Sequence, residues 1–157
     1  MIGYSLGRFI RKRDMIFQVL FVIGAMPLIF LGGMHLYFTV KDNRHPTFIV
    51  PRSIKLIRDM QAEPLRVTSE TDMWRAWIGF NISHSIAVLL VGIGTLYLVW
   101  VYPQWVVSDI LMLWASPVLA WVFVILSRCF WFSKPFQGTL VSAVLLTAAA
   151  IAATLPI

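Results

Sequence analysis

Four long apolar runs dominate the chain, and the short stretches between them carry nearly all of the charge. A helix needs roughly 20 mostly apolar residues to cross about 30 Å of hydrocarbon. Because lipid offers the peptide backbone no hydrogen-bonding partner, runs of this length form helices. The predicted spans are residues 15–40, 74–101, 106–131 and 136–154. We therefore predict an all-α fold, an integral membrane four-helix bundle in one domain, running up-down-up-down because the second and third connections are short.

The first connection, residues 41–73, is the only sizeable predicted extramembrane segment. Within it Ile54, Ile57 and Met60 recur at three-residue steps with charged residues between them. This spacing puts the three apolar side chains on one helical face, which predicts a short interfacial helix. Such a helix would lie on the membrane or cap the bundle.

Capping and aromatic residues mark the ends of the predicted spans. The stretch "TSETD" supplies Ser69 or Thr71 as a helix N-cap for the second span. Aromatic rings with a polar group favour the headgroup level of a bilayer. Six of them fall near predicted span ends: Trp74, Trp77, Trp100, Tyr102, Trp105 and Trp131.

Composition supports a membrane protein and argues against a nucleic-acid-binding one. Hydrophobic residues make up 59% of the 157 residues, above the share of about half in soluble proteins. The net charge is +6, but the basic residues lie between or at the ends of apolar runs. Membrane orientation and anionic lipid headgroups therefore explain them better than nucleic acid, and we expect bound lipids. The single cysteine, Cys129, leaves no disulfide or CxxC motif within the chain.

The amino-terminal apolar run, about 24 residues, is too long for the core of a signal peptide, so we interpret it as an uncleaved first span. Counting Lys and Arg alone would place the long loop in the cytoplasm. Against this, a dense basic cluster, Arg8, Arg11, Lys12 and Arg13, directly precedes the first span. We predict a multi-pass protein of the cell inner membrane with both termini in the cytoplasm.

The last span, "TLVSAVLLTAAAIAATLP", is rich in Ala with Ser and Thr. Small side chains let two helix backbones approach closely. This helix is therefore expected either to pack centrally in the bundle or to present a face to a partner protein, and the sequence does not distinguish the two.

Only two ionisable side chains fall well inside the predicted spans, His35 and His84. At 1.5 Å per residue they lie roughly 7 and 15 Å from the same membrane face, so they could meet. Asn81 shares a helical stripe with His84, and polar groups in lipid are costly, so this stripe should face the bundle interior. We predict an intramembrane polar cluster of His35, Asn81 and His84, with Tyr37 as a further member.

Three interpretations of this cluster stay open. Asn and His at helix interfaces often only hydrogen-bond across to a neighbour, for about 0.6 to 2 kcal/mol. Alternatively, His35 and His84 could be the axial ligands of a haem b, their only role as metal ligands. A quinone or lipid headgroup could instead be hydrogen-bonded by His84 and Asn81 and stacked on Trp77.

Enzyme and transporter chemistry are poorly supported. Ser83, His84 and Ser85 are adjacent on one helix and point in different directions, so they cannot form a nucleophile–base pair. No G-x-S-x-G, H-E-x-x-H or glycine-rich phosphate loop occurs. Coupled carriers bury charged residues along their pathway, whereas Asp109 and Arg128 lie close enough to the ends of the third span to snorkel.

Two segments, "GGMHLYFTVKD" and "TDMWRAWIGFNISHSIAVLLVG", resemble a motif pair of a family of small, uncharacterised bacterial membrane proteins with four predicted helices. The resemblance runs through Met34, His35, Trp74, Arg75, Trp77, Gly79, Phe80, Asn81, Ser83, His84 and Ser85. It implies a bacterial inner-membrane setting and a similar four-helix shape, and it implies no chemistry.

The sequence thus favours a structural or accessory subunit of a larger membrane complex or a homo-oligomer, without catalytic activity or a cofactor of its own. The residues predicted to form its interface are Trp74, Ile54, Ile57 and Met60. The alternative is a small membrane redox protein that holds haem b or quinone between His35 and His84.

Overall fold

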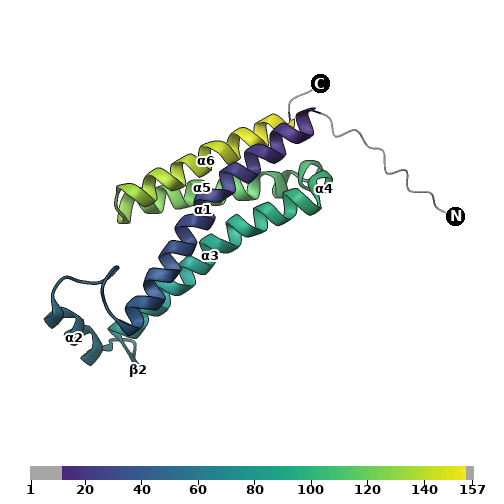
Figure 1. Ribbon diagram of the computed structural model, residues 1–157. Coiled ribbons are helices and arrows are strands. Elements are labelled where there is room, and N and C mark those ends of the chain that lie inside the picture. The colour runs from purple at the N-terminus through teal and green to yellow at the C-terminus, as the bar shows by residue number, and fades with distance from the viewer. Residues whose placement is uncertain (1–11, 155–157) are drawn as a thin grey trace. The chain divides into compact units, whose positions relative to one another are not determined.

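The computed structural model describes residues 12–154, with side chains from residue 15 onward. Its helices are α1 (Lys12–Arg44), α2 (Ile54–Ala62), α3 (Met73–Val101), α4 (Pro103–Ser108), α5 (Ile110–Phe130) and α6 (Ser133–Thr154). Within this range four helices, α1, α3, α5 and α6, are long and apolar enough to cross a membrane (Figure 1). The predicted all-α, four-helix bundle class is confirmed. The basic cluster from Arg8 to Arg13 lies outside the residues whose side chains are described.

The third predicted span begins later than expected, because the chain breaks between α4 and α5. Asp109 caps the start of α5, where its Oδ1 accepts the N–H groups of Leu111 at 2.8 Å and Met112 at 3.1 Å. These are N–H groups that the first turn of a helix leaves without a partner. The prediction that Asp109 lies inside a helix running from Val106 is therefore wrong. Asp109 is the N-cap residue directly before α5.

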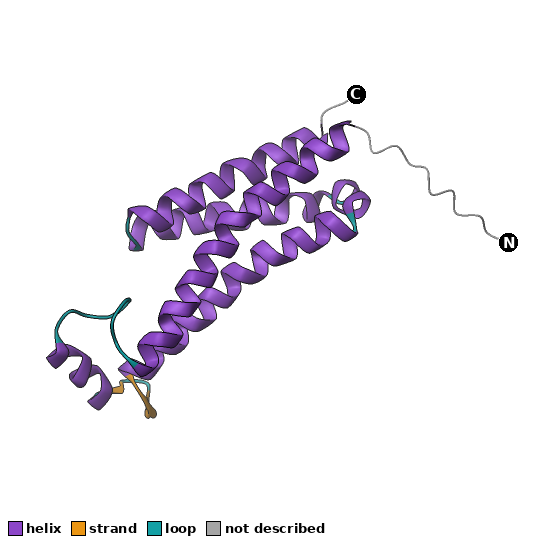
Figure 2. Cartoon of the chain, viewed as in Figure 1, coloured by secondary structure: helices purple, strands orange, loops and turns teal. Residues whose placement is uncertain are grey.

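The long loop contains α2, as predicted, and also a small hairpin that the sequence did not suggest. The hairpin pairs β1 (Pro64–Leu65) with β2 (Thr68–Asp72) in antiparallel register (Figure 2). The prediction that Ser69 or Thr71 is the N-cap of the second span is wrong, because "TSETD" forms β2. Asp72 takes that role, since its Oδ1 accepts the N–H of Arg75 at 2.7 Å.

The described chain divides into two compact units. The first unit contains residues 12–28 and 91–154, and the second contains Ile29–Leu90. In the first unit α5 and α6 run side by side (Figure 1). Its buried core draws on α1, α5 and α6 and on single residues of α3 and α4. The buried side chains are Phe17, Phe21, Ala25, Leu28, Val99, Val106, Leu113, Ala120, Phe123, Val124, Ala143, Leu146, Ala149, Ala150 and Ala153.

The small residues of α6 are used inside the first unit. A Cβ on Gly24 would lie only 3.0 Å from Leu146 Cγ and 3.1 Å from the Leu146 backbone nitrogen, so α1 and α6 approach closely there. The buried Ser142 hydroxyl donates a hydrogen bond to the Gly24 carbonyl. Ser127 and Thr139 join α5 to α6 through their hydroxyls at 2.9 Å. The small residues of α6 therefore pack inside the first unit, and a face of this helix for a partner protein stays a prediction.

Candidate functional site

The candidate site lies in the second unit, where α1 and α3 pack against each other. The contact is close at Gly32: a Cβ there would lie 3.0 Å from Leu89 Cγ and 3.2 Å from the Ser85 carbonyl oxygen. The face of α3 that turns inward repeats at three- and four-residue steps, as the polar stripe predicted. Its buried residues in this unit are Trp74, Ile78, Asn81, Ser85 and Val88.

The structure brings His35, Asn81 and His84 together, as their spacing along the two spans predicts. His35 Nε2 lies 3.0 Å from Asn81 Oδ1. The ring centroids of His35 and His84 are 6.0 Å apart, with the planes nearly perpendicular at 84°. On its other side His84 stacks on Phe80, with centroids 6.2 Å apart and planes 14° apart. Phe80 is 67% exposed, so the cluster runs from the helix interface toward the outer surface of α3.

The hydrogen bonds of Asn81 fix the direction of its contact with His35. Asn81 Nδ2 donates to the Trp77 carbonyl at 2.8 Å, which leaves Oδ1 as the acceptor toward His35. A neutral imidazole donates through one nitrogen and accepts through the other. His35 Nε2 is therefore the donor in this arrangement.

Hydroxyl groups next to the cluster bond back to their own helices. Thr39 donates to the His35 carbonyl at 2.8 Å, and Ser85 donates to the Asn81 carbonyl at 2.7 Å. Both hydroxyls are buried, and a buried hydroxyl without a partner costs about 1 to 3 kcal/mol. The His35–Asn81 side-chain hydrogen bond therefore joins two helices, while the hydroxyls of Thr39 and Ser85 are satisfied within their own helices.

Two predicted members lie elsewhere. Tyr37 is 58% exposed and contacts Phe38 at a centroid distance of 5.7 Å, so the prediction that it joins His35 is wrong. Its position two residues after His35 turns its side chain to a different face of α1. Trp77 links α3 to the loop, since its Nε1 donates a long hydrogen bond of 3.4 Å to the Ile49 carbonyl. Its stacking on a ligand stays a prediction.

Asp42 is a structured site that sequence reasoning missed. Its side chain is 0% exposed and accepts three loop N–H groups. Oδ1 accepts from Thr47 and Phe48, both at 2.8 Å, and Oδ2 accepts from Ile49 at 2.6 Å. One signal pointed to it: an acidic residue in the last turn of a helix is disfavoured by the helix dipole. Its hydrogen bonds to the three loop N–H groups explain this position, because they hold the loop against the end of α1.

The predicted interface residues divide into two groups. Trp74 is only 5% exposed, so its assignment to an outward interface is wrong. It lies one turn before Ile78 and seven residues before Asn81, which places it on the buried face of α3. Ile54 is 68% exposed, and α2 has no buried residue. The interface role of Ile54, Ile57 and Met60 stays a prediction.

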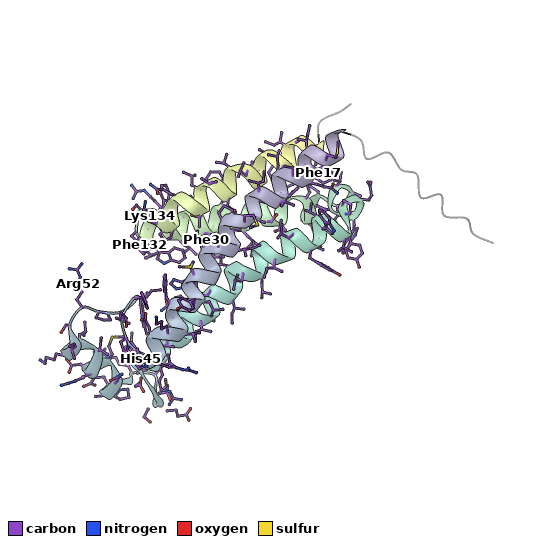
Figure 3. All side chains as sticks on the ribbon, in the orientation of Figure 1. Phe17, Phe30, His45, Arg52, Phe132 and Lys134 are labelled. Atoms are coloured by element: carbon purple, nitrogen blue, oxygen red, sulfur yellow. The ribbon has the colours of Figure 1, made fainter. Side chains whose placement is uncertain are left out.

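Among the described residues no group of three His, Cys, Asp or Glu side chains could hold a metal ion. His45 is exposed in the loop that follows α1 (Figure 3). A shallow, open hollow lies beside the hairpin, lined by Ala62, Pro64, Ser69, Glu70, Thr71, Asp72 and Arg75. It is lined mainly by exposed loop side chains and brings none of the predicted site residues together.

Comparison with known families, curated proteins and solved structures gives no match to this chain. The resemblance to a bacterial four-helix membrane family therefore stays a prediction from its two motifs.

Proposed function

We propose that the chain is a small integral membrane subunit with a structural or accessory role in a larger membrane complex. The observation that carries this proposal is the His35–Asn81 hydrogen bond, a direct link between two membrane-spanning helices. Such bonds fix the register of neighbouring helices in lipid. The adjacent hydroxyls of Thr39 and Ser85 are satisfied by their own helices, which also fits a packing role.

The surface that we propose for the partner is the apolar face of α2, formed by Ile54, Ile57 and Met60. This helix carries no buried residue, whereas the small residues of α6 are already used within the first unit. We place both termini in the cytoplasm on the basis of the basic cluster before the first span. The bacterial inner membrane is proposed from the resemblance of the two motifs. In that orientation α2 lies on the opposite surface.

Replacing Ile54 by aspartate should release the partner. We expect the full-length chain, extracted in mild detergent, to migrate with a larger protein in constant ratio, and Ile54→Asp to lower that ratio about tenfold, because a carboxylate on an apolar contact costs at least 1.4 kcal/mol. The measurement is quantitative mass spectrometry of the native complex. Val67→Asp is the matched control, since Val67 is 88% exposed in the same loop. A free monomer in the unsubstituted protein would contradict the proposal.

The alternative is a small redox protein with haem b or quinone held at His35 and His84. The proximity of the two rings favours it, at 6.0 Å between centroids. The hydrogen bond of His35 opposes it, because iron ligation through Nε2 would need the nitrogen that now donates to Asn81.

Optical spectra separate the two functions. For the structural subunit we expect no haem Soret band in the purified protein and an identical spectrum for His84→Ala, because neither histidine would carry iron. The control is Ser83→Ala, a neighbouring exposed position on α3. A Soret band that His84→Ala removes and Ser83→Ala keeps would establish the redox alternative. Quinone binding, the other redox possibility, is tested by extracting the purified protein and assaying the extract for quinone.

A further inference from the structure

The last turn of α1 reaches the boundary between hydrocarbon and headgroups. Residues 15–40 contain no Lys, Arg, Asp or Glu, and Lys41 is the first charged residue after them. At 1.5 Å per residue this stretch is about 39 Å long, enough to cross about 30 Å of hydrocarbon. This length lets the ammonium of Lys41 reach the level of the lipid phosphates.

Aromatic rings and the Asp42 loop fix the position of this ammonium. Lys41 Nζ lies 5.1 Å from the ring centroid of Phe48 and 5.8 Å from that of Tyr37. Phe48 in turn stacks on Phe38, with centroids 4.6 Å apart. The backbone N–H of Phe48 is held by the buried Asp42 carboxylate at 2.8 Å. The loop is thus folded back so that a ring from it faces a lysine of α1.

The positive charge of Lys41 is not neutralised by a carboxylate in the described part of the chain. The neighbouring Asp42 points inward to the loop N–H groups. Arg44, three residues further, is exposed on the same side of α1 and adds a second positive charge. This end of the helix therefore presents two cations to the headgroup region.

An exposed apolar face leads from these cations toward the middle of the span. Phe30, Met34, Tyr37 and Lys41 follow at steps of four, three and four residues, so they share one face of α1. Phe30 is 66% exposed, Met34 38% and Tyr37 58% (Figure 3 labels Phe30). This face offers an acyl chain a surface that begins at the charged group and continues into the hydrocarbon.

We propose that Lys41, framed by Tyr37 and Phe48, binds the phosphate of an anionic phospholipid, whose acyl chain lies along Tyr37, Met34 and Phe30. The charge selects the headgroup: an anionic lipid complements Lys41 and Arg44, whereas the quaternary ammonium of a choline lipid is repelled by them. The site does not depend on the proposed accessory role.

Native mass spectrometry of the delipidated full-length chain tests this site, with phosphatidylglycerol and phosphatidylcholine of the same chain length as probes. We expect phosphatidylglycerol to be retained more strongly than phosphatidylcholine. Lys41→Met should lower that preference about fivefold, the factor for one basic residue near an anionic surface, and Lys41→Arg should keep it. Lys55→Met is the matched control, because Lys55 is exposed in the same loop and contacts no aromatic ring of the described residues. Equal melting temperatures would show that each variant is folded.

Three results would overturn the site. Equal retention of the two lipids by the unsubstituted protein would remove the charge selectivity. Equal losses for Lys41→Met and Lys55→Met would mean diffuse attraction to the whole loop. Displacement of phosphatidylglycerol by the same concentration of inorganic phosphate would mean a site for a free anion, in which the acyl chain has no part.

Discussion

Replacing Asp42 by alanine should release the loop from Thr47 to Ile49 and open the chain to trypsin after Arg44. Asp42 accepts three backbone N–H groups and is fully buried. Hydrogen bonds to a charged group contribute roughly 1.5 to 3 kcal/mol each. The three contributions are not expected to add fully, so we expect the free energy of opening this loop to fall by about 3 kcal/mol in total.

The measurement is the initial rate of cleavage in lipid nanodiscs, with the cut sites identified by mass spectrometry. When local opening precedes cleavage, the loss of about 3 kcal/mol corresponds to a rate increase on the order of 100-fold. Asp59→Ala is the control, since it removes an exposed carboxylate from α2 in the same segment. Equal cleavage of the two variants would mean that the Asp42 hydrogen bonds do not hold the loop.

The four membrane-length helices could be predicted from the sequence because lipid leaves the backbone no alternative. A long apolar run therefore determines its secondary structure without reference to the rest of the chain. The ends of the helices were less predictable, since they depend on capping. Asp109 starts α5 and Asp72 starts α3, each by accepting N–H groups of the first turn. Both residues were visible in the sequence, but several other polar residues nearby could have served as caps.

The polar cluster was predictable in part. The burial cost of polar groups in lipid turns Asn81 inward, and helix geometry places His35 and His84 at similar depth. Tyr37 lies outside the cluster, because a side chain two residues after His35 is on a different face of the helix. Trp74 lies on the buried face of α3, as its spacing from Ile78 indicates, although its residue type favours the headgroup level.

The loop could not be predicted, because long-range contacts determine its structure. The stack of Phe48 on Phe38 and the bond from Trp77 Nε1 to the Ile49 carbonyl join residues separated by 10 and 28 positions. No local sequence pattern in the loop predicts these long-range contacts. Asp42 holds the backbone of Phe48 and its neighbours from the end of α1, so one acidic residue at a helix end determines where the Phe48 ring lies.

Gly32→Ala should destabilise the second unit, whereas Gly33→Ala should not. The added Cβ at Gly32 would lie 3.0 Å from Leu89 Cγ and 3.1 Å from the Leu89 backbone nitrogen. A side chain can move aside, but backbone can give way only if α1 and α3 separate. Overpacking of this kind costs about 1 to 3 kcal/mol. We expect a lower midpoint for unfolding in a titration with sodium dodecyl sulfate, followed by far-ultraviolet circular dichroism.

Gly33 is the adjacent control, because a Cβ there meets nothing within 4 Å. Alanine at that position should stabilise the helix by up to about 1 kcal/mol, since glycine is the weaker helix former. The two neighbouring substitutions should thus shift the midpoint in opposite directions, although the sequence "GG" gives no reason to separate them. Equal shifts would show that α1 and α3 do not approach closely at Gly32. The His35–Asn81 hydrogen bond, one turn further along α1, would then have to hold the two helices without support from backbone contact.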